Sequence, residues 1–141
     1  MDMITWDDEY NLDIELIDSQ HQELCKIINK LGNAMDMDED KEILSEIVQE
    51  LIDYTRYHFS VEEEYFKEFD YSEQEDHMGE HKYFLDYFAK IKQAFEDKDL
   101  SVTSDDRLSM DILKYLVTWF VSHITGNDRK YIELFKENGV V

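Results

Sequence analysis

The chain contains no proline and only four glycines among its 141 residues. Proline breaks helices, glycine weakens them, and both residues are typical of the tight turns that connect β-strands. Their scarcity predicts long, uninterrupted helices and argues against a loop-rich β fold. The length suits one domain that is large enough to bury a core. We therefore expect residues 1–141 to form a single helical domain.

Apolar residues recur at steps of three and four along four segments, which is the spacing of one face of a helix. The pattern predicts an N-terminal arm and four helices, over residues 1–16 and about 17–37, 41–69, 72–98 and 104–138. Ser19 with Gln22, and Ser72 with Glu75, have the spacing of capping boxes that would begin the first and third helices. Short connections favour antiparallel neighbours. The expected fold is all-α, an up-down-up-down antiparallel four-helix bundle with an N-terminal arm.

The balance of charge excludes several classes of partner. Asp and Glu number 35 against 14 Lys and Arg, so the formal net charge is -21. Such a surface repels phosphate, and we expect neither nucleic acid nor membrane as a partner. A hydrophobic content of 43% is too high for a disordered acidic chain. The single cysteine excludes a disulfide framework and a CxxC zinc site.

The sequence shows no signal for export or membrane insertion. No apolar run approaches the roughly 18–20 residues of a membrane span. The acidic N-terminal segment lacks the basic and apolar parts of a secretory signal. We therefore expect a cytoplasmic location.

All five histidines lie on the apolar faces of the predicted helices. They are His21, His58, His77, His81 and His123. A single histidine in such a place is usually a core residue with a hydrogen bond. Burying five imidazoles without a shared reason would be too costly for a small domain, and a metal-free structural bundle leaves them unexplained. Because neutral imidazole is a common metal ligand, the pattern predicts a metal site.

Two carboxylates stand at ligand spacing from these histidines. His58 and Glu62 are four residues apart, so they share one helix face, as do His77 and His81. Acidic residues are abundant here, and only the position of Glu62 makes it a candidate.

Asp128 follows His123 by five residues, which in a regular α-helix places the two about 140° apart. A widened, π-helical turn would bring both toward one site, and such turns are frequent at functional sites. Gly126 lies between them and is expected to ease this distortion. The sequence therefore predicts a local irregularity in the fourth helix.

Several metal sites are excluded by their motifs. The chain contains no HExxH, no Glu-x-x-His and no EF-hand loop. Five histidines with two carboxylates exceed the four ligands of one zinc ion. Two metal ions bridged by carboxylates fit this donor set better.

The candidate ligands lie in four motifs: Asp18-Ser19-Gln20-His21, His58-Phe59-Ser60-Val61-Glu62-Glu63, His77-Met78-Gly79-Glu80-His81 and His123-Ile124-Thr125-Gly126-Asn127-Asp128. These resemble the ligand motifs of the hemerythrin family, and most closely those of its single-domain bacterial members. The resemblance covers nearly the whole chain and implies a non-haem di-iron site that binds O2. It assigns His77, His81 and His123 to one iron and His21 and His58 to the other. Glu62 and Asp128 would bridge the two ions together with an oxo or hydroxo group.

Two roughly octahedral irons with this ligand set keep one open position, on the iron that has two histidines. An O2 ligand at that position needs an apolar pocket that keeps water and anions away. The candidate lining is Ile17 and Leu24 from the first helix, Phe120 and Ile124 from the fourth, and Trp6 from the arm.

The resemblance implies reversible O2 binding, for carriage, storage, delivery or sensing, and not catalysis. The alternative is a di-iron redox enzyme, such as an oxidase, a peroxidase or a nitric oxide reductase. That alternative needs a substrate path and a source of electrons, and the sequence displays neither. We expect a monomer, with an O2-consuming enzyme as a candidate partner.

Overall fold

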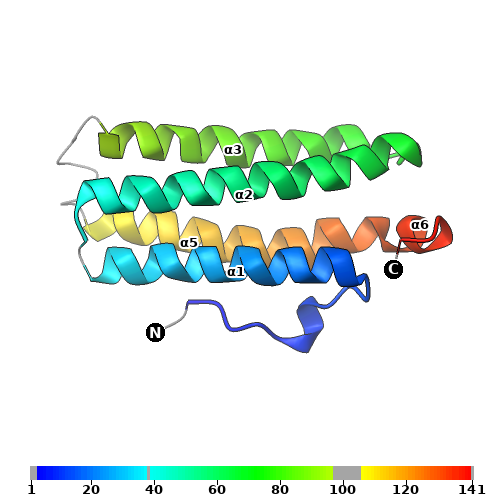
Figure 1. Cartoon of the computed structure of the whole chain (residues 1–141), viewed down its shortest axis with the longest axis horizontal. Coiled ribbons are helices and arrows are strands. Elements are labelled where there is room, and N and C mark those ends of the chain that lie inside the picture. Colours follow the sequence, from blue (N-terminus) through cyan, green and yellow to red (C-terminus); the bar gives the residue numbers. More distant parts are fainter. Residues whose placement is uncertain (1–2, 38, 97–105, 141) are drawn as a thin grey trace.

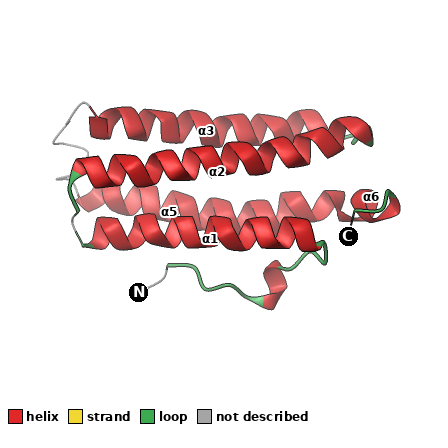
Figure 2. Ribbon diagram, in the orientation of Figure 1, coloured by secondary structure: helices red, strands yellow, loops and turns green. Residues whose placement is uncertain are grey.

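The computed structural model describes residues 3–37, 39–96 and 106–140. The described chain forms four long helical segments. They lie side by side and alternate in direction (Figure 1). Helices and connecting loops make up all of the described residues, with no strand among them (Figure 2). The predicted all-α four-helix bundle is therefore confirmed.

The helices are α1 (Glu15–Asp36), α2 (Lys41–Glu68), α3 (Gln74–Glu96) and α5 (Asp106–Ser122). The fourth segment continues through a π-helical turn, His123–Asn127, and a 3-10 turn, Asp128–Tyr131, into α6 (Ile132–Glu137). Asp40 caps α2, because its carboxylate accepts the Ile43 N–H at 3.0 Å. The boundaries predicted near residues 98 and 104 lie outside the described residues.

The first helix begins earlier than the capping-box interpretation required. Ser19 lies inside α1, where its hydroxyl donates to the Leu16 carbonyl at 2.9 Å. The start is set from outside the helix, since the Asp18 carboxylate accepts the Leu12 N–H at 2.7 Å. Asp13, with φ 61°, turns the chain between them. The proposed Ser19–Gln22 box is therefore wrong.

The start of α3 also differs from the prediction. Gln74 begins the helix, and its N–H donates to the Tyr71 carbonyl at 3.2 Å. Ser72 therefore lies within a turn and does not cap the helix. That turn follows from the end of α2, where Asp70 has φ 53° and the Tyr71 N–H donates to the Phe66 carbonyl at 2.9 Å.

The N-terminal arm runs along α1 (Figure 1). The buried Asn29 side chain holds it, accepting the Ile4 N–H at 2.9 Å and donating to the Ile4 carbonyl at 2.7 Å. Gly32 allows the close approach, because a Cβ there would lie 2.1 Å from the Met3 sulfur. Trp6 meets the ring of Phe120 edge-on at 6.4 Å, which joins the arm to α5.

The buried apolar side chains form two clusters. The larger one fills most of the bundle and includes Leu24, Phe59, Phe84 and Phe120. The smaller one, near α6, consists of Leu12, Ile14, Ile17, Phe66, Tyr71, Tyr131 and Phe135. The histidines touch both clusters, since the His81 ring stacks on Phe59 and the His77 ring meets Phe66. A polar layer therefore separates two apolar regions of one bundle.

The buried face of α2 departs from the heptad spacing of its apolar residues. Continued from Leu44 and Leu51 through His58, that spacing predicts that Val61 and Tyr65 face inward, but both are half-buried, whereas Phe59 and Phe66 are buried. A strict seven-residue repeat drifts by about 20° per heptad relative to an α-helix, and the error accumulates along 28 residues.

No helix of the described residues is long and apolar enough to cross a membrane.

Candidate metal centre

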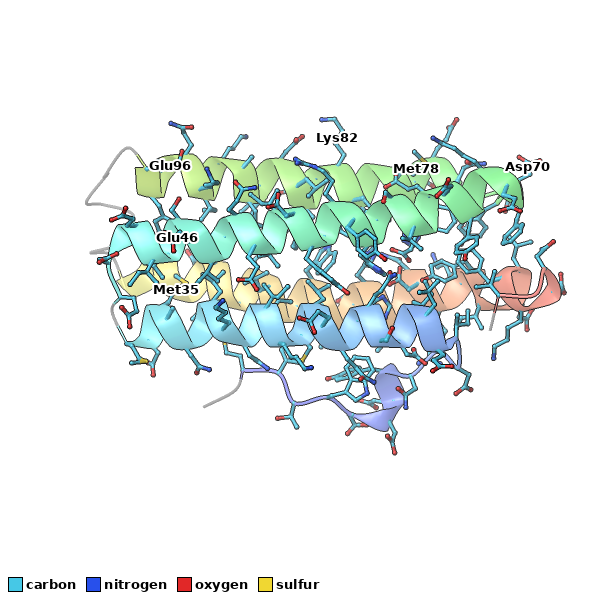
Figure 3. The ribbon with its side chains drawn as sticks, in the orientation of Figure 1. Met35, Glu46, Asp70, Met78, Lys82 and Glu96 are labelled. Carbon is cyan, nitrogen blue, oxygen red and sulfur yellow. The ribbon has the colours of Figure 1, made fainter. Side chains whose placement is uncertain are left out.

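Seven ionisable side chains meet in the polar layer between the two apolar clusters. Each of the five histidines is at most 4% exposed, and Glu62 and Asp128 are 0% exposed. By contrast, Lys82, which follows His81 in the chain, points away from the bundle (Figure 3). All four helical segments contribute: α1 His21, α2 His58 and Glu62, α3 His77 and His81, and the fourth segment His123 and Asp128. Two buried carboxylates in an apolar core are costly without compensating positive charge.

The seven side chains form two groups that share both carboxylates. The three-histidine group contains Glu62, His77, His81, His123 and Asp128. The two-histidine group contains His21, His58, Glu62 and Asp128. Within each group, one ligand atom from every residue lies within 4.8 Å of all the others. The structure thus brings together every metal-ligand candidate that the sequence singled out.

The carboxylate of Asp128 faces both groups with different oxygens. Its Oδ1 lies 3.0 Å from Nε2 of His77 and 3.1 Å from Nε2 of His123. Its Oδ2 lies 3.0 Å from Nε2 of His21. One carboxylate that presents an oxygen to each of two nitrogen sets has the arrangement of a bridging ligand.

Glu62 also reaches both groups, through one oxygen. Its Oε1 lies 3.1 Å from Nε2 of His58 and 3.5 Å from Nε2 of His81.

These converging atoms make no hydrogen bonds of acceptable geometry with any described residue. They are both carboxylate oxygens of Glu62 and Asp128 and the Nε2 atoms of His21, His77, His81 and His123. Buried polar atoms without partners are rare and costly. Metal ions would satisfy all of them at once, because imidazole nitrogen and carboxylate oxygen suit first-row transition metals. The residues present therefore fit a pair of metal ions.

The electrostatics of the cluster follow from this crowding. Burial and the charge of Asp128 act to raise the pKa of Glu62, but His58 and His81 outweigh them and lower it. Burial opposes ionisation of Asp128 too, yet His123, His21 and His77 hold its pKa well below the usual range. Burial acts to lower the pKa of His123, but Asp128, Glu80 and Glu62 raise it to about 10. Both carboxylates are therefore held as anions.

The irregular turn in the fourth segment is confirmed. The Asp128 N–H donates to the His123 carbonyl, five residues back, across the π-helical turn. Side chains add hydrogen bonds to carbonyls there: the Thr125 hydroxyl donates to Val121 at 2.5 Å, and Arg129 Nε donates to Thr125 at 3.3 Å. Gly126 has no special role, because it lacks a positive φ and an added Cβ would meet nothing within 4 Å.

Three polar residues that the sequence analysis missed contact the outer nitrogens of the histidines. The His58 Nδ1–H donates to Gln20 Oε1 at 2.5 Å, and the His81 Nδ1–H donates to Glu63 Oε2 at 3.0 Å. Glu80 Oε2 lies 3.6 Å from Nδ1 of His123. Helical spacing could have identified Gln20, because it lies three residues after Ile17 on the buried face of α1. Nothing in the sequence distinguishes the two glutamates from the many other acidic residues.

Aromatic rings complete the surroundings. Phe59 stacks on His81 with centroids 3.8 Å apart, and Trp119 stacks on His123 at 4.7 Å. The Tyr131 hydroxyl is buried without a hydrogen-bond partner among the described residues. Burial, with the charges of Asp128 and Glu62, raises its pKa well above the ordinary value.

The five residues proposed to line an O2 pocket are not all brought together. Leu24, Phe120 and Ile124 are buried in the larger apolar cluster, and Trp6 packs against that cluster. Ile17 is equally buried but belongs to the smaller cluster, near α6. The candidates therefore lie on both sides of the ligand layer.

Comparison with known proteins places this geometry in a family. Residues 12–135 match the model of the hemerythrin HHE cation binding domain. A bacteriohemerythrin of Clostridium acetobutylicum is 35% identical over 135 residues, 93% of this chain and 100% of that protein. A myohemerythrin of Theromyzon tessulatum is 25% identical, covering 89% of this chain and 88% of its own.

The fold is also similar to that of a solved hemerythrin structure. A crystal structure of a hemerythrin mutant superposes with a TM-score of 0.83, covering 95% of this chain and 98% of that one at 24% identity. Because the family model spans most of the chain and a relative above 30% identity covers nearly all of it, this chain belongs to the hemerythrin family.

Proposed function

We propose that this protein binds O2 reversibly at a non-haem di-iron centre held by the seven buried ligands. His77, His81 and His123 would hold one iron, and His21 and His58 the other, with Glu62 and Asp128 bridging them. The observation that carries the proposal is the pair of ligand groups that share two carboxylates but differ by one histidine. Iron bound there would supply the electrons and the binding position for O2.

The unequal ligand count supports a binding position for O2 on the two-histidine side. The two-histidine group offers one protein ligand fewer, and a metal binds an external ligand where its coordination is incomplete. Leu24, Phe120 and Ile124, all buried in one apolar cluster, would shield this side from water, with Trp6 at the edge and Ile17 on the opposite side. The protein would act as a carrier, store, donor or sensor of O2, as a monomer, with an O2-consuming enzyme as a partner.

An optical spectrum tests this function directly. The iron-loaded protein should contain two iron ions per chain and show a visible band in air that vanishes on removal of O2 and returns on readmission. Irreversible bleaching with turnover of an added substrate would instead support an oxidase, a peroxidase or a nitric oxide reductase. Asp128→Ala should lose iron and band together. Asp111→Ala, which removes an exposed carboxylate from α5, is the matched control.

A further inference from the structure

Two of the buried histidines are held by side chains from a neighbouring helix in the same way. Gln20 of α1 accepts the Nδ1–H of His58 on α2, and Glu63 of α2 accepts the Nδ1–H of His81 on α3. Each supporting residue is adjacent in sequence to a proposed ligand, His21 or Glu62. Both bonds fix the ring so that Nε2 points to the metal position.

The two supports differ in charge. Gln20 is a neutral amide on the two-histidine group, whereas Glu63 is a carboxylate on the three-histidine group. A second carboxylate, Glu80, lies 3.6 Å from Nδ1 of His123, too far to accept a hydrogen bond, but it adds negative charge to the three-histidine group. On the other side, Nδ1 of His21 is buried and has no hydrogen-bond partner among the described residues. Anionic support is therefore confined to the three-histidine group in the part of the chain that the structure describes.

We propose that Glu63 is a positioning residue that strengthens metal retention by the three-histidine group, and that the neutral Gln20 leaves the ion of the two-histidine group easier to release. This inference rests on the proposed two-iron centre and names how its halves differ.

The physical reason lies in the imidazole between the metal and its support. An Nδ1–H that donates to a carboxylate makes Nε2 a stronger donor to the metal than one that donates to an amide. The bond is also charge-assisted, which restricts the ring more firmly. Glu63 is three-quarters buried, so solvent weakens this effect little, whereas Glu80 is half exposed and contributes less. Loss of such a support typically costs about 10–100-fold in metal affinity.

The test is the release of ferrous iron from the anaerobic, fully loaded protein to a coloured chelator. The wild type should release its two ions in two phases of equal amplitude. The extra histidine of the three-histidine group would also slow the release of its ion. Two phases in the wild type therefore do not by themselves identify the effect of Glu63, and the variants are needed to separate the two contributions. Glu63→Gln should accelerate the slow phase by about 10-fold or more and leave the fast phase unchanged. Gln20→Glu should slow the fast phase by a similar factor.

Matched variants control for charge alone. Glu64→Gln and Gln22→Glu make the same chemical changes at exposed neighbours and should leave both phases unchanged. Circular dichroism confirms that each variant keeps its helices, and Gln20→Glu tests the proposal independently if Glu63→Gln does not fold.

Several results would overturn the inference while leaving the proposed function standing. They are a single release phase from the wild type, equal acceleration of both phases by Glu63→Gln, or an effect of either variant on the other phase. Fewer than two iron ions in the wild type would instead refute the proposed function itself.

Discussion

Nε2 of His123 lies 3.1 Å from Oδ1 of Asp128, although the two residues are five positions apart in the chain. A regular α-helix would separate their directions by about 140°. The π-helical turn His123–Asn127 inserts one extra residue per turn and realigns them. The fourth segment thereby places two candidate ligands on one side, and it still continues into α6 to close the smaller apolar cluster.

The glycine in this turn should be replaceable. Gly126→Ala is expected to raise the free energy of unfolding by about 0.5–1 kcal/mol, because alanine restricts the unfolded chain more than glycine does. Gly139, with φ 84°, ends α6, and Gly139→Ala should lower the free energy of unfolding by about 1–2 kcal/mol. Urea unfolding and iron per chain measure both variants. Iron loss in Gly126→Ala would show that the turn needs its glycine after all.

Iron should stabilise the fold. Without it, the fully buried carboxylates of Glu62 and Asp128 have oxygens with no hydrogen-bond partner among the described residues. A ligand present at 100 times its Kd adds about 2.7 kcal/mol, which corresponds to a rise in Tm of at least about 5 °C for a domain of this size. Calorimetry of the loaded and chelator-treated protein measures the difference, and the same chelator added to Asp128→Ala is the control. Equal melting temperatures would contradict the prediction.

The apolar side chains proposed to line an O2 pocket should govern the lifetime of the oxygenated protein. Phe120→Leu and Ile124→Val leave space in a fully buried wall, so at least one should admit water and speed the decay of the oxygenated spectrum. Iron per chain should stay unchanged, because no ligand is lost. Phe88→Leu and Ile112→Val create comparable space elsewhere in the larger cluster and serve as matched controls. Unchanged decay in both test variants would remove these residues from the pocket.

Stability should fall in alkaline solution through Tyr54. Burial, together with the charge of Glu23, raises the pKa of Tyr54 from 10.0 to about 12. The folded state therefore favours the neutral phenol. The stability that Tyr54 contributes in this way is fully present below pH 10 and is lost as the pH rises through about 12. Tyr54→Phe should lose less stability than the wild type between pH 9 and pH 12, as measured by urea unfolding. Titration of the phenols at 295 nm, folded and in urea, provides the control; equal losses of stability would refute the assignment.

Much of the centre could be predicted from local spacing. The absence of proline and the apolar periodicity indicated four long helices, and the i,i+4 pairs on α2 and α3 indicated which side chains share a face. The five-residue interval between His123 and Asp128 even indicated the π-helical turn. Each of these features depends on the geometry within one helix, which a sequence displays directly.

Other features depend on how separate segments approach one another, and only the tertiary structure decided them. The start of α1 is set by the hydrogen bond from Leu12 in the arm to Asp18 in the first turn of the helix, so the capping pattern at Ser19 was misleading. The buried face of α2 follows its neighbours, which turn Phe59 and Phe66 inward.

The hydrogen bonds that Gln20 and Glu63 accept from candidate metal ligands are the clearest case of a feature that only the tertiary structure decided. The amide of Gln20 meets His58, which is 38 residues away, and the carboxylate of Glu63 meets His81, which is 18 residues away. The composition of a strongly acidic chain gives no reason to select Glu63 over the exposed Glu64 beside it. The choice is made by helix packing, because only one of two adjacent positions on α2 faces α3.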